Sequence, residues 1–327
     1  MLHRYTTLIG AVGLALAAGT APAQNNTEPV LTFAEPAAGA QTELETAPKR
    51  EIEYALRAYG VYQFNTDLSA NQYGDVSVWR IGSVFDAEIA QDARGTWGLI
   101  AAAEYSRYEW TEPALTPGPV ADPFDRVFGL IVGGKYEYQF NRNWYGWAGL
   151  GITSWGEDRA QFSETITGGI QLGGGYKVNE DLDLGLWVSI TSELEEHDQI
   201  FAFPIVDWQI DDHWSMSSRP IGLRGGLLEL AYDINPTWAV VSDVSYQQRT
   251  FRLDNDALAP GGAVRDVLVP ISIGVRWTPE GKDIELLGQI GVQLFQEYQM
   301  RSSSGNVINT FETQTTPIFS LMFRWNF

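Results

Sequence analysis

Charged side chains recur at alternate positions in segments whose other positions are apolar. Glu229 and Asp233, for example, stand between Leu228, Leu230 and Tyr232. Carboxylates that face a water-filled passage lower the energy of cations and disfavour anions. The residues that we expect to set such a preference are Glu229, Asp233, Asp243, Arg249, Asp266, Arg276, Glu285, Glu297 and Arg324. Acids outnumber bases in this set, so we expect the passage to favour cations or neutral solutes. In the alternative interpretation, the charges pair across neighbouring strands and hold a filled interior rigid.

A hydrolytic site is the main alternative chemistry. His197 stands in an acidic stretch, residues 193–198, and Ser192 directly precedes that stretch. A Ser-His-acid arrangement is defined by geometry and not by spacing, so this segment is a candidate site for a hydrolase near one rim of the fold. The stretch lacks the spaced D-x-D-x-D-G pattern of a calcium loop, and no cofactor fingerprint accompanies it. We therefore predict no metal site and no cofactor.

The elements that must position these side chains are β-strands. In the segment from Thr316 to Phe327, aromatic and aliphatic residues alternate with Ser320, Met322, Arg324 and Asn326. A period of two with one apolar and one polar face is typical of a strand that has lipid on one side and a polar lumen on the other. The same division recurs in residues 182–191, 228–234, 267–277 and 284–297. In the last of these, we expect Glu297 to lie on the lumen face with Glu285.

Two kinds of break separate the alternating runs. The tight breaks are 91–96, 141–143, 179–181, 211–213, 235–237 and 279–282, and the long breaks are 65–74, 109–125, 158–163, 192–199, 217–225, 254–263 and 301–309. They alternate strictly along the chain. This alternation predicts an all-β fold, a transmembrane antiparallel up-and-down β-barrel of about fourteen strands, with a range of twelve to sixteen. Because a barrel of this size is intermediate between a filled one and a wide pore, we expect a narrow passage.

Tryptophan follows several of the tight breaks directly. Trp97, Trp144, Trp214 and Trp238 occupy this place, and Leu182 takes it once. Tryptophan favours the boundary between lipid and water because it has an apolar body and a polar tip. We therefore expect these four residues to form an aromatic girdle at one membrane boundary. A soluble β-sandwich with aromatics beside its turns is the alternative.

The first residues of the chain resemble an export signal. An apolar run from Leu8 to Ala18 precedes Ala21-Pro22-Ala23, which fits a small-x-small cleavage site. The run is too short for a membrane-spanning helix, which needs about 20 residues. We predict a signal peptide over residues 1–23, a flexible periplasmic leader over 24–50 and a barrel over 51–327.

Composition excludes several functions. The chain has no cysteine, which removes disulfides, thiolate metal sites and a lipid-modified N-terminal cysteine. Its formal net charge is −20, so electrostatic binding to nucleic acid is not expected, because that needs clustered basic residues.

The cleavage site, the alternation of turns and loops, and the segment Phe323-Arg324-Trp325-Asn326-Phe327 together resemble Gram-negative outer-membrane β-barrel proteins. This resemblance covers nearly the whole mature chain and extends to porins and to uncharacterised barrels. It implies location in the cell outer membrane, contact with outer-membrane lipid, and an insertion signal in Phe323, Trp325 and Phe327 that the barrel-insertion machinery reads. We expect a porin-like, narrow passive channel for small solutes. The alternatives are an outer-membrane hydrolase with a rim site near His197, and a structural or loop-binding barrel that does not transport.

Overall fold

The computed structural model describes residues 52–69, 73–90, 94–114 and 122–327. The predicted signal peptide and leader lie outside these residues. Within the described part of the chain, no helix is long and apolar enough to cross a membrane.

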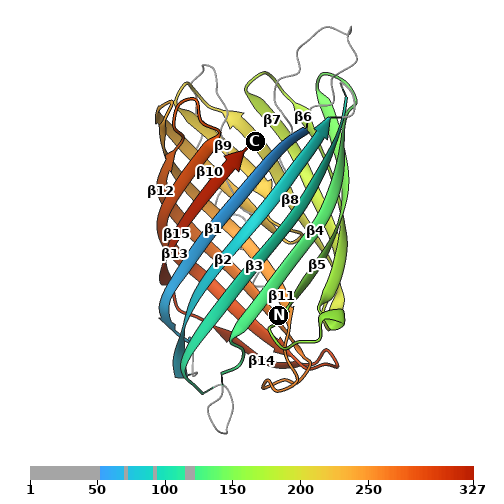
Figure 1. Cartoon of the computed structure of the whole chain (residues 1–327), viewed down its shortest axis with the longest axis vertical. Coiled ribbons are helices and arrows are strands. Elements are labelled where there is room, and N and C mark those ends of the chain that lie inside the picture. Colours follow the sequence, from blue (N-terminus) through green and yellow to red (C-terminus); the bar gives the residue numbers. More distant parts are fainter. Residues whose placement is uncertain (1–51, 70–72, 91–93, 115–121) are drawn as a thin grey trace.

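Antiparallel strands form one closed sheet, shown in Figure 1. The strands are β1 (Ile52–Asp67), β2 (Tyr73–Ala90), β3 (Gly95–Ala114), β4 (Arg126–Gln139), β5 (Trp144–Glu157), β6 (Ile166–Lys177), β7 (Leu182–Glu193), β8 (Glu196–Gln209), β9 (Trp214–Pro220), β10 (Gly225–Asn235), β11 (Trp238–Arg252), β12 (Ala263–Trp277), β13 (Ile284–Arg301), β14 (Val307–Glu312) and β15 (Thr316–Asn326). A short 3₁₀ turn, Phe162–Glu164, precedes β6. Strand β1 pairs with β15 and closes the sheet into a barrel.

The last two strands, β14 and β15, together occupy one strand position in the barrel. Strand β14 pairs with β13 over Glu297–Arg301, and β15 pairs with the same strand over Ile284–Gln293. The barrel therefore has fourteen strand positions, which confirms the predicted fold class and strand number.

The two faces of the wall differ in chemistry, as the period of two predicts. Outward positions carry large apolar side chains that stay exposed, among them Val132, Leu150, Ile290 and Leu321, each more than half exposed. Inward positions on the same strands carry buried polar or charged side chains, such as Lys135 and Thr153. A closed sheet leaves no unpaired edge, and this division of faces is the architecture of a barrel that crosses a lipid bilayer.

Several short connections at one end of the barrel share a turn with an Asn or Asp at its start. We call this the turn end; it lies at the top of Figure 1, where β15 finishes. The side-chain oxygen of Asn141 accepts the N–H groups of Asn143 and Trp144 at 2.9 and 3.0 Å. Asp211 and Asn235 accept from the second and third following residues in the same way. The two N–H donors also lower the pKa of the Asp211 carboxyl. The tight breaks at Asn141, Asp211 and Asn235 are therefore Asx turns, and each ends at the backbone N–H of a girdle tryptophan.

The four tryptophans of the predicted girdle face outward near the turn end. Each lies directly opposite another ring on the neighbouring strand: the pairs are Trp97 with Tyr136, Trp144 with Tyr176, Trp214 with Tyr232, and Trp238 with Trp277. Their ring centroids are 4.7 to 6.2 Å apart. The rings of Trp325 and Phe327 meet at 4.5 Å on the same outer surface.

Several expected long loops are shorter than predicted because strands extend into them. The segment 192–199 was expected to be a loop, but β7 and β8 run to Glu193 and from Glu196, so only Leu194 and Glu195 make the turn. Glu195 has a φ of 55°. Strands β3 and β9 likewise continue to Ala114 and Pro220. Strand ends that extend beyond the apolar belt face water and carry polar residues. A polar stretch in the sequence therefore does not show where strand pairing ends.

The loop ends of β11 and β12, with the turn between them, lean into the barrel. We call residues Arg249–Asp266 the inner hairpin. Arg252 pairs with Gly156 of β5 on the opposite wall, and the Asp254 N–H donates to Glu157 Oε2 at 2.7 Å. Gly262 approaches the wall closely, because a Cβ there would clash with the Arg301 carbonyl oxygen.

Apolar side chains of the inner hairpin complete a hydrophobic cluster inside the loop end of the barrel. Phe251, Leu253, Ala259 and Val264 belong to it. From the wall and the connections beside it the cluster receives Leu68, Val76, Val78, Val84, Ile100, Ala102, Tyr108, Phe124, Val127, Ile131, Trp155, Tyr298, Met300 and Phe311. Because this cluster joins β1–β5 to β11–β14, the inner hairpin occupies the lumen at the loop end.

Candidate functional site

Most of the predicted selectivity residues lie on the inner face of the wall. Asp266, Glu229, Arg276 and Glu285 are buried there. Asp243 and Arg249 line an internal cavity. Asp233 is half-buried on β10, and Arg324 lies opposite Arg57 in the pairing of β15 with β1.

One arginine near the turn end joins two of the predicted acids. Arg276 Nη2 lies 2.6 Å from Glu229 Oε1, and Arg276 Nε lies 3.7 Å from Glu285 Oε1. Arg219 of β9, which was not among the predicted residues, lies 3.4 Å from the second oxygen of Glu229. Because these side chains are almost fully buried, each arginine offsets the cost of burying a carboxylate. The pairing interpretation therefore describes this part of the interior.

A second pair stands next to the inner hairpin. Arg80 Nη2 lies 3.2 Å from Asp266 Oδ2, and the Asp266 side chain is fully buried. The Tyr108 hydroxyl and the Gln296 amide also donate to Asp266, at 3.2 and 2.9 Å. Asp266 thus holds wall residues of β2, β3 and β13 against the start of β12.

Glu297 does not face the lumen beside Glu285, contrary to the prediction. A bulge interrupts the pairing of β12 with β13, so that Pro270 pairs with Gln293 while Val269 pairs with Phe295. Because Leu294 is an extra residue, the side chains of β13 that follow it point to the opposite face from the one that regular alternation predicts. Gln296 consequently points inward to Asp266, whereas Glu297 lies 3.8 Å from Arg265 on the opposite face.

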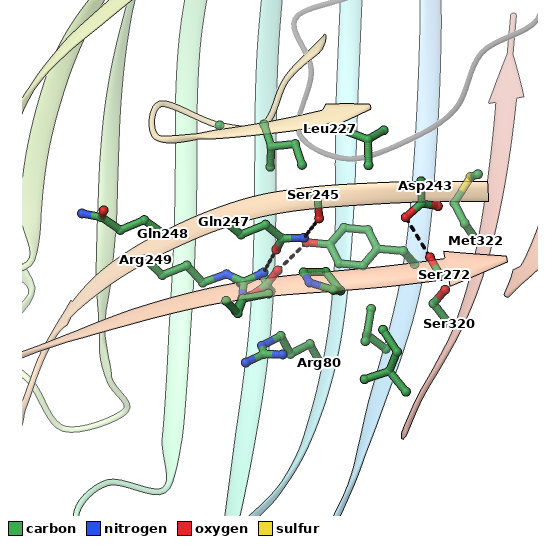
Figure 2. A pocket seen from close by; sticks show the side chains of 18 of the residues that line it. Arg80, Leu227, Asp243, Ser245, Gln247, Gln248, Arg249, Ser272, Ser320 and Met322 are labelled. Carbon is green, nitrogen blue, oxygen red and sulfur yellow. Dashed lines mark hydrogen bonds and ion pairs between the residues drawn. The ribbon is translucent and has the colours of Figure 1, made fainter. Parts of the chain in front are cut away.

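A cavity of about 160 Å³ lies in the lumen beneath the inner hairpin. Figure 2 shows its polar side, where Ser245, Gln247 and Arg249 of β11 point toward one another. The Gln247 amide donates to Ser245 Oγ at 3.0 Å, and Arg249 Nη2 donates to Gln247 Oε1 at 2.9 Å. Ser245 and Gln247 were not among the predicted residues, although they continue the alternation of Asp243 and Arg249 along one strand.

The acids of the cavity wall hold neighbouring side chains. Glu104 accepts hydrogen bonds from the Tyr59 hydroxyl at 2.6 Å and from the Ser106 hydroxyl at 3.1 Å, and Arg249 Nε lies 3.4 Å from it. Asp243 accepts from the Ser272 hydroxyl at 2.7 Å and from the Gln289 amide. Hydrogen bonds of this kind fix the carboxylates in position and lower their cost of burial.

The connection between β9 and β10 also enters the lumen and covers one side of the cavity. Its residues Ile221 and Leu223 contribute apolar side chains to the lining. The Ser189 hydroxyl donates to the Leu223 carbonyl oxygen at 2.5 Å, and Arg224 forms a buried ion pair with Glu193. Apolar and polar residues do not alternate in this segment, so the sequence pattern does not predict that it enters the lumen.

Ion pairs hold the outer surface of the inner hairpin against the β7–β8 turn. Arg252 Nη1 lies 2.5 Å from Glu195 Oε1. Glu196 Oε1 lies 3.4 Å from Arg265 Nη1 and 2.8 Å from Arg301 Nη2. The acidic stretch that suggested a hydrolase therefore neutralises arginines at the loop end.

The remaining groups of that stretch show no catalytic arrangement. The Ser192 hydroxyl bonds with the backbone N–H and carbonyl oxygen of Gly168, at 2.9 and 3.1 Å, while His197 is exposed on β8. Across the described residues, no group of three or more His, Cys, Asp or Glu side chains is arranged to hold a metal ion.

Comparisons with known proteins give only structural likenesses. The chain matches no model of a known protein family, and no curated protein matches its sequence. An outer membrane channel from Pseudomonas putida F1 is 13% identical, over 90% of this chain and 100% of that one, with a TM-score of 0.47. A Pseudomonas aeruginosa FadL homologue is 10% identical, over 84% and 90% of the two chains, with a TM-score of 0.48. The Pseudomonas putida toluene transporter TodX is 12% identical, over 86% and 90%, with a TM-score of 0.41. What this chain does is therefore inferred from its own residues.

Proposed function

We propose that the protein is an outer-membrane barrel that acts as a narrow passive channel for small solutes, with a cation or neutral preference. The observation that carries this proposal is a polar lumen with a cavity at its centre, inside a closed wall whose outer surface is apolar. Only a closed barrel or a helix satisfies the backbone within lipid, and an apolar outer belt lowers the cost of insertion. The turn end would face the periplasm and the loop end the exterior.

The inner hairpin would control passage. It joins the two walls at the loop end through the hydrophobic cluster and through Arg252 and Arg265, which face Glu195 and Glu196. A solute that moves from the exterior to the cavity must displace this hairpin. In this proposal the hairpin closes the loop end, and passage would require it to move away from β5.

The charge of the lumen supports a neutral or cationic solute over an anion. Glu229, Asp266 and Glu285 are offset by arginines. Asp243 is instead held by a hydroxyl and an amide, which leave its formal charge in place. A carboxylate that no arginine offsets repels anions that pass beside it. Its effect on neutral molecules is much smaller.

Solute uptake by liposomes tests the proposal. The mature chain, from Gln24 onward, would be reconstituted in parallel with its Phe251→Ala variant, whose hairpin is loosened. We expect liposomes with the variant to swell in small neutral polyols and more slowly as the polyol grows. If both proteins are inserted but neither makes the liposomes swell faster than protein-free liposomes, the proposed channel function is refuted.

A further inference from the structure

Glu157, at the end of β5, holds two loop-end segments through its carboxylate. Its Oε2 accepts the backbone N–H of Asp254, in the inner hairpin, at 2.7 Å. Its Oε1 accepts the backbone N–H of Asp125, just before β4, at 3.3 Å. The Glu157 side chain is buried, and its neighbour Gly156 pairs with Arg252 of the hairpin. Glu157 is therefore the polar side chain that fastens the inner hairpin to the opposite wall.

The charged groups that face Glu157 have the same sign as its carboxylate. They are the side chains of Asp125 and Asp254, which belong to the two segments that it holds. A buried carboxylate without an opposite charge is costly, and like charges beside it add to that cost. Hydrogen bonds from the two backbone N–H groups offset only part of it. Loss of the Glu157 charge therefore favours the arrangement in which the hairpin is held against β5.

The arginines of the adjoining segments are engaged with other acids. Arg252 Nη1 lies 2.5 Å from Glu195 Oε1. Arg126 lies on the outer surface, with its Nε 3.1 Å from Asp125 and its Nη1 3.2 Å from Asp158. Charged side chains on the outer surface at this height show that the end of β5 lies beyond the apolar belt, where protons from water reach it.

Burial, together with the two neighbouring carboxylates, raises the pKa of the Glu157 carboxyl from its ordinary value of 4.5 to about 7. Once the hairpin moves away, the carboxyl is solvated and returns to the ordinary pKa. The held hairpin thus binds the proton more tightly than the released one. Acid therefore stabilises the held position, and this stabilisation is lost as the pH rises through 7. The neutral carboxyl keeps an oxygen that accepts the Asp254 N–H.

We propose that Glu157 is a pH-sensitive latch, which holds the inner hairpin against β5 in acid and releases it as the solution becomes neutral or alkaline. The latch rests on the proposed channel function only for its consequence, a passage that opens as the pH rises. The equilibrium between held and released hairpin is measured without transport.

Cysteine labelling of the mature chain in liposomes tests the latch, because the chain has no cysteine of its own. Ala259→Cys places a thiol in the buried part of the hairpin, and Ser303→Cys places one on the exposed turn after β13. The ratio of their rates of reaction with a maleimide cancels the effect of pH on the thiol and reports the fraction of released hairpin. With a pKa of about 7 in the held form and 4.5 in the released form, we expect this ratio to rise about 70-fold from pH 5 to pH 8.

Two adjacent acids provide matched variants. Glu157→Gln has no proton to lose, so its labelling ratio should not change with pH. Asp158→Asn removes an acid whose side chain is 37% exposed, and it should keep the full rise. Asp254→Asn removes one of the two facing charges and should move the midpoint of the rise to lower pH.

Two results would overturn the latch. One is a labelling ratio that stays flat from pH 5 to pH 8 while Glu157 is intact. The other is a rise that persists in Glu157→Gln, which would assign the pH dependence to another group, such as the exposed His197.

Labelling and swelling separate the two proposals. Swelling of liposomes that carry Phe251→Ala, without pH-dependent labelling, would overturn the latch and leave the channel intact. A pH-dependent labelling ratio that Glu157→Gln abolishes, in liposomes that do not swell with Phe251→Ala, would support the latch and overturn the channel.

Discussion

Removing the Phe251 ring should release the inner hairpin. The side chain is fully buried, and its centroid lies 5.1 Å from that of Phe124 and 6.1 Å from that of Tyr108. Replacing a buried phenylalanine by alanine typically costs about 3–5 kcal/mol. The lower figure would change the ratio of open to closed hairpin by about 150-fold.

The ion pairs at the loop end should matter less than this ring. The Arg252 and Glu195 side chains are 10% and 20% exposed, so water partly screens their attraction. Pairs of partly exposed groups contribute about 1 kcal/mol or less. Glu195→Gln should therefore change the ratio of open to closed hairpin by about fivefold at most.

Single-channel recording of Phe251→Ala in a planar bilayer measures this ratio as the open probability. Phe128→Ala is the matched control, because Phe128 lies on the outer surface of β4 and is 46% exposed. We expect a large rise in open probability for Phe251→Ala and none for Phe128→Ala. An open probability for Phe251→Ala equal to that of the unmodified chain, at verified folding, would refute the idea that the hairpin closes the channel.

Three further predictions concern the wall, the turns and the selectivity. Arg276→Gln leaves Glu229 without its closest arginine, so the free energy of unfolding should fall by about 3–5 kcal/mol in urea titrations, and an unchanged midpoint would contradict the role of this pair. Asn235→Ala removes the acceptor of two N–H groups in a solvent-exposed turn, and the same titration should show a loss of only about 1 kcal/mol; a loss as large as that of Arg276→Gln would be inconsistent with a local turn. Asp233→Asn combined with Asp243→Asn removes two lumen charges, so the reversal potential in a KCl gradient should move away from cation preference, and no movement would show that other groups set it.

The alternation of apolar and polar residues, together with the order of tight and long breaks, was sufficient to predict the barrel. Because successive strand residues face opposite sides, the inward placement of Glu229, Asp243 and Glu285 follows from the pattern of their apolar neighbours. The same reasoning predicts Ser245 and Gln247, which were overlooked because uncharged residues carry a weaker signal.

Alternation could not predict features in which the chain departs from a regular strand. One bulge at Leu294 reverses the facing of Glu297, and the shift is hidden in the sequence because the inward residues beyond it, Tyr298 and Met300, are apolar. The inner hairpin was hidden for a different reason. Alternation places Phe251 and Val264 on the inward face with Arg249 and Asp266, but only tertiary contacts show that these strand ends leave the wall and pack against the opposite side of the barrel.

Solutes that use this channel should cross through the lumen and past the cavity. Leu227 lines the cavity, whereas Leu228 is its neighbour on the outer face of β10. The unitary conductance of Phe251→Ala, measured with either Leu227→Trp or Leu228→Trp added, tests this path. We expect the tryptophan at 227 to lower the conductance severalfold and the tryptophan at 228 to leave it unchanged. Equal conductance of the two double variants would contradict a path through the cavity.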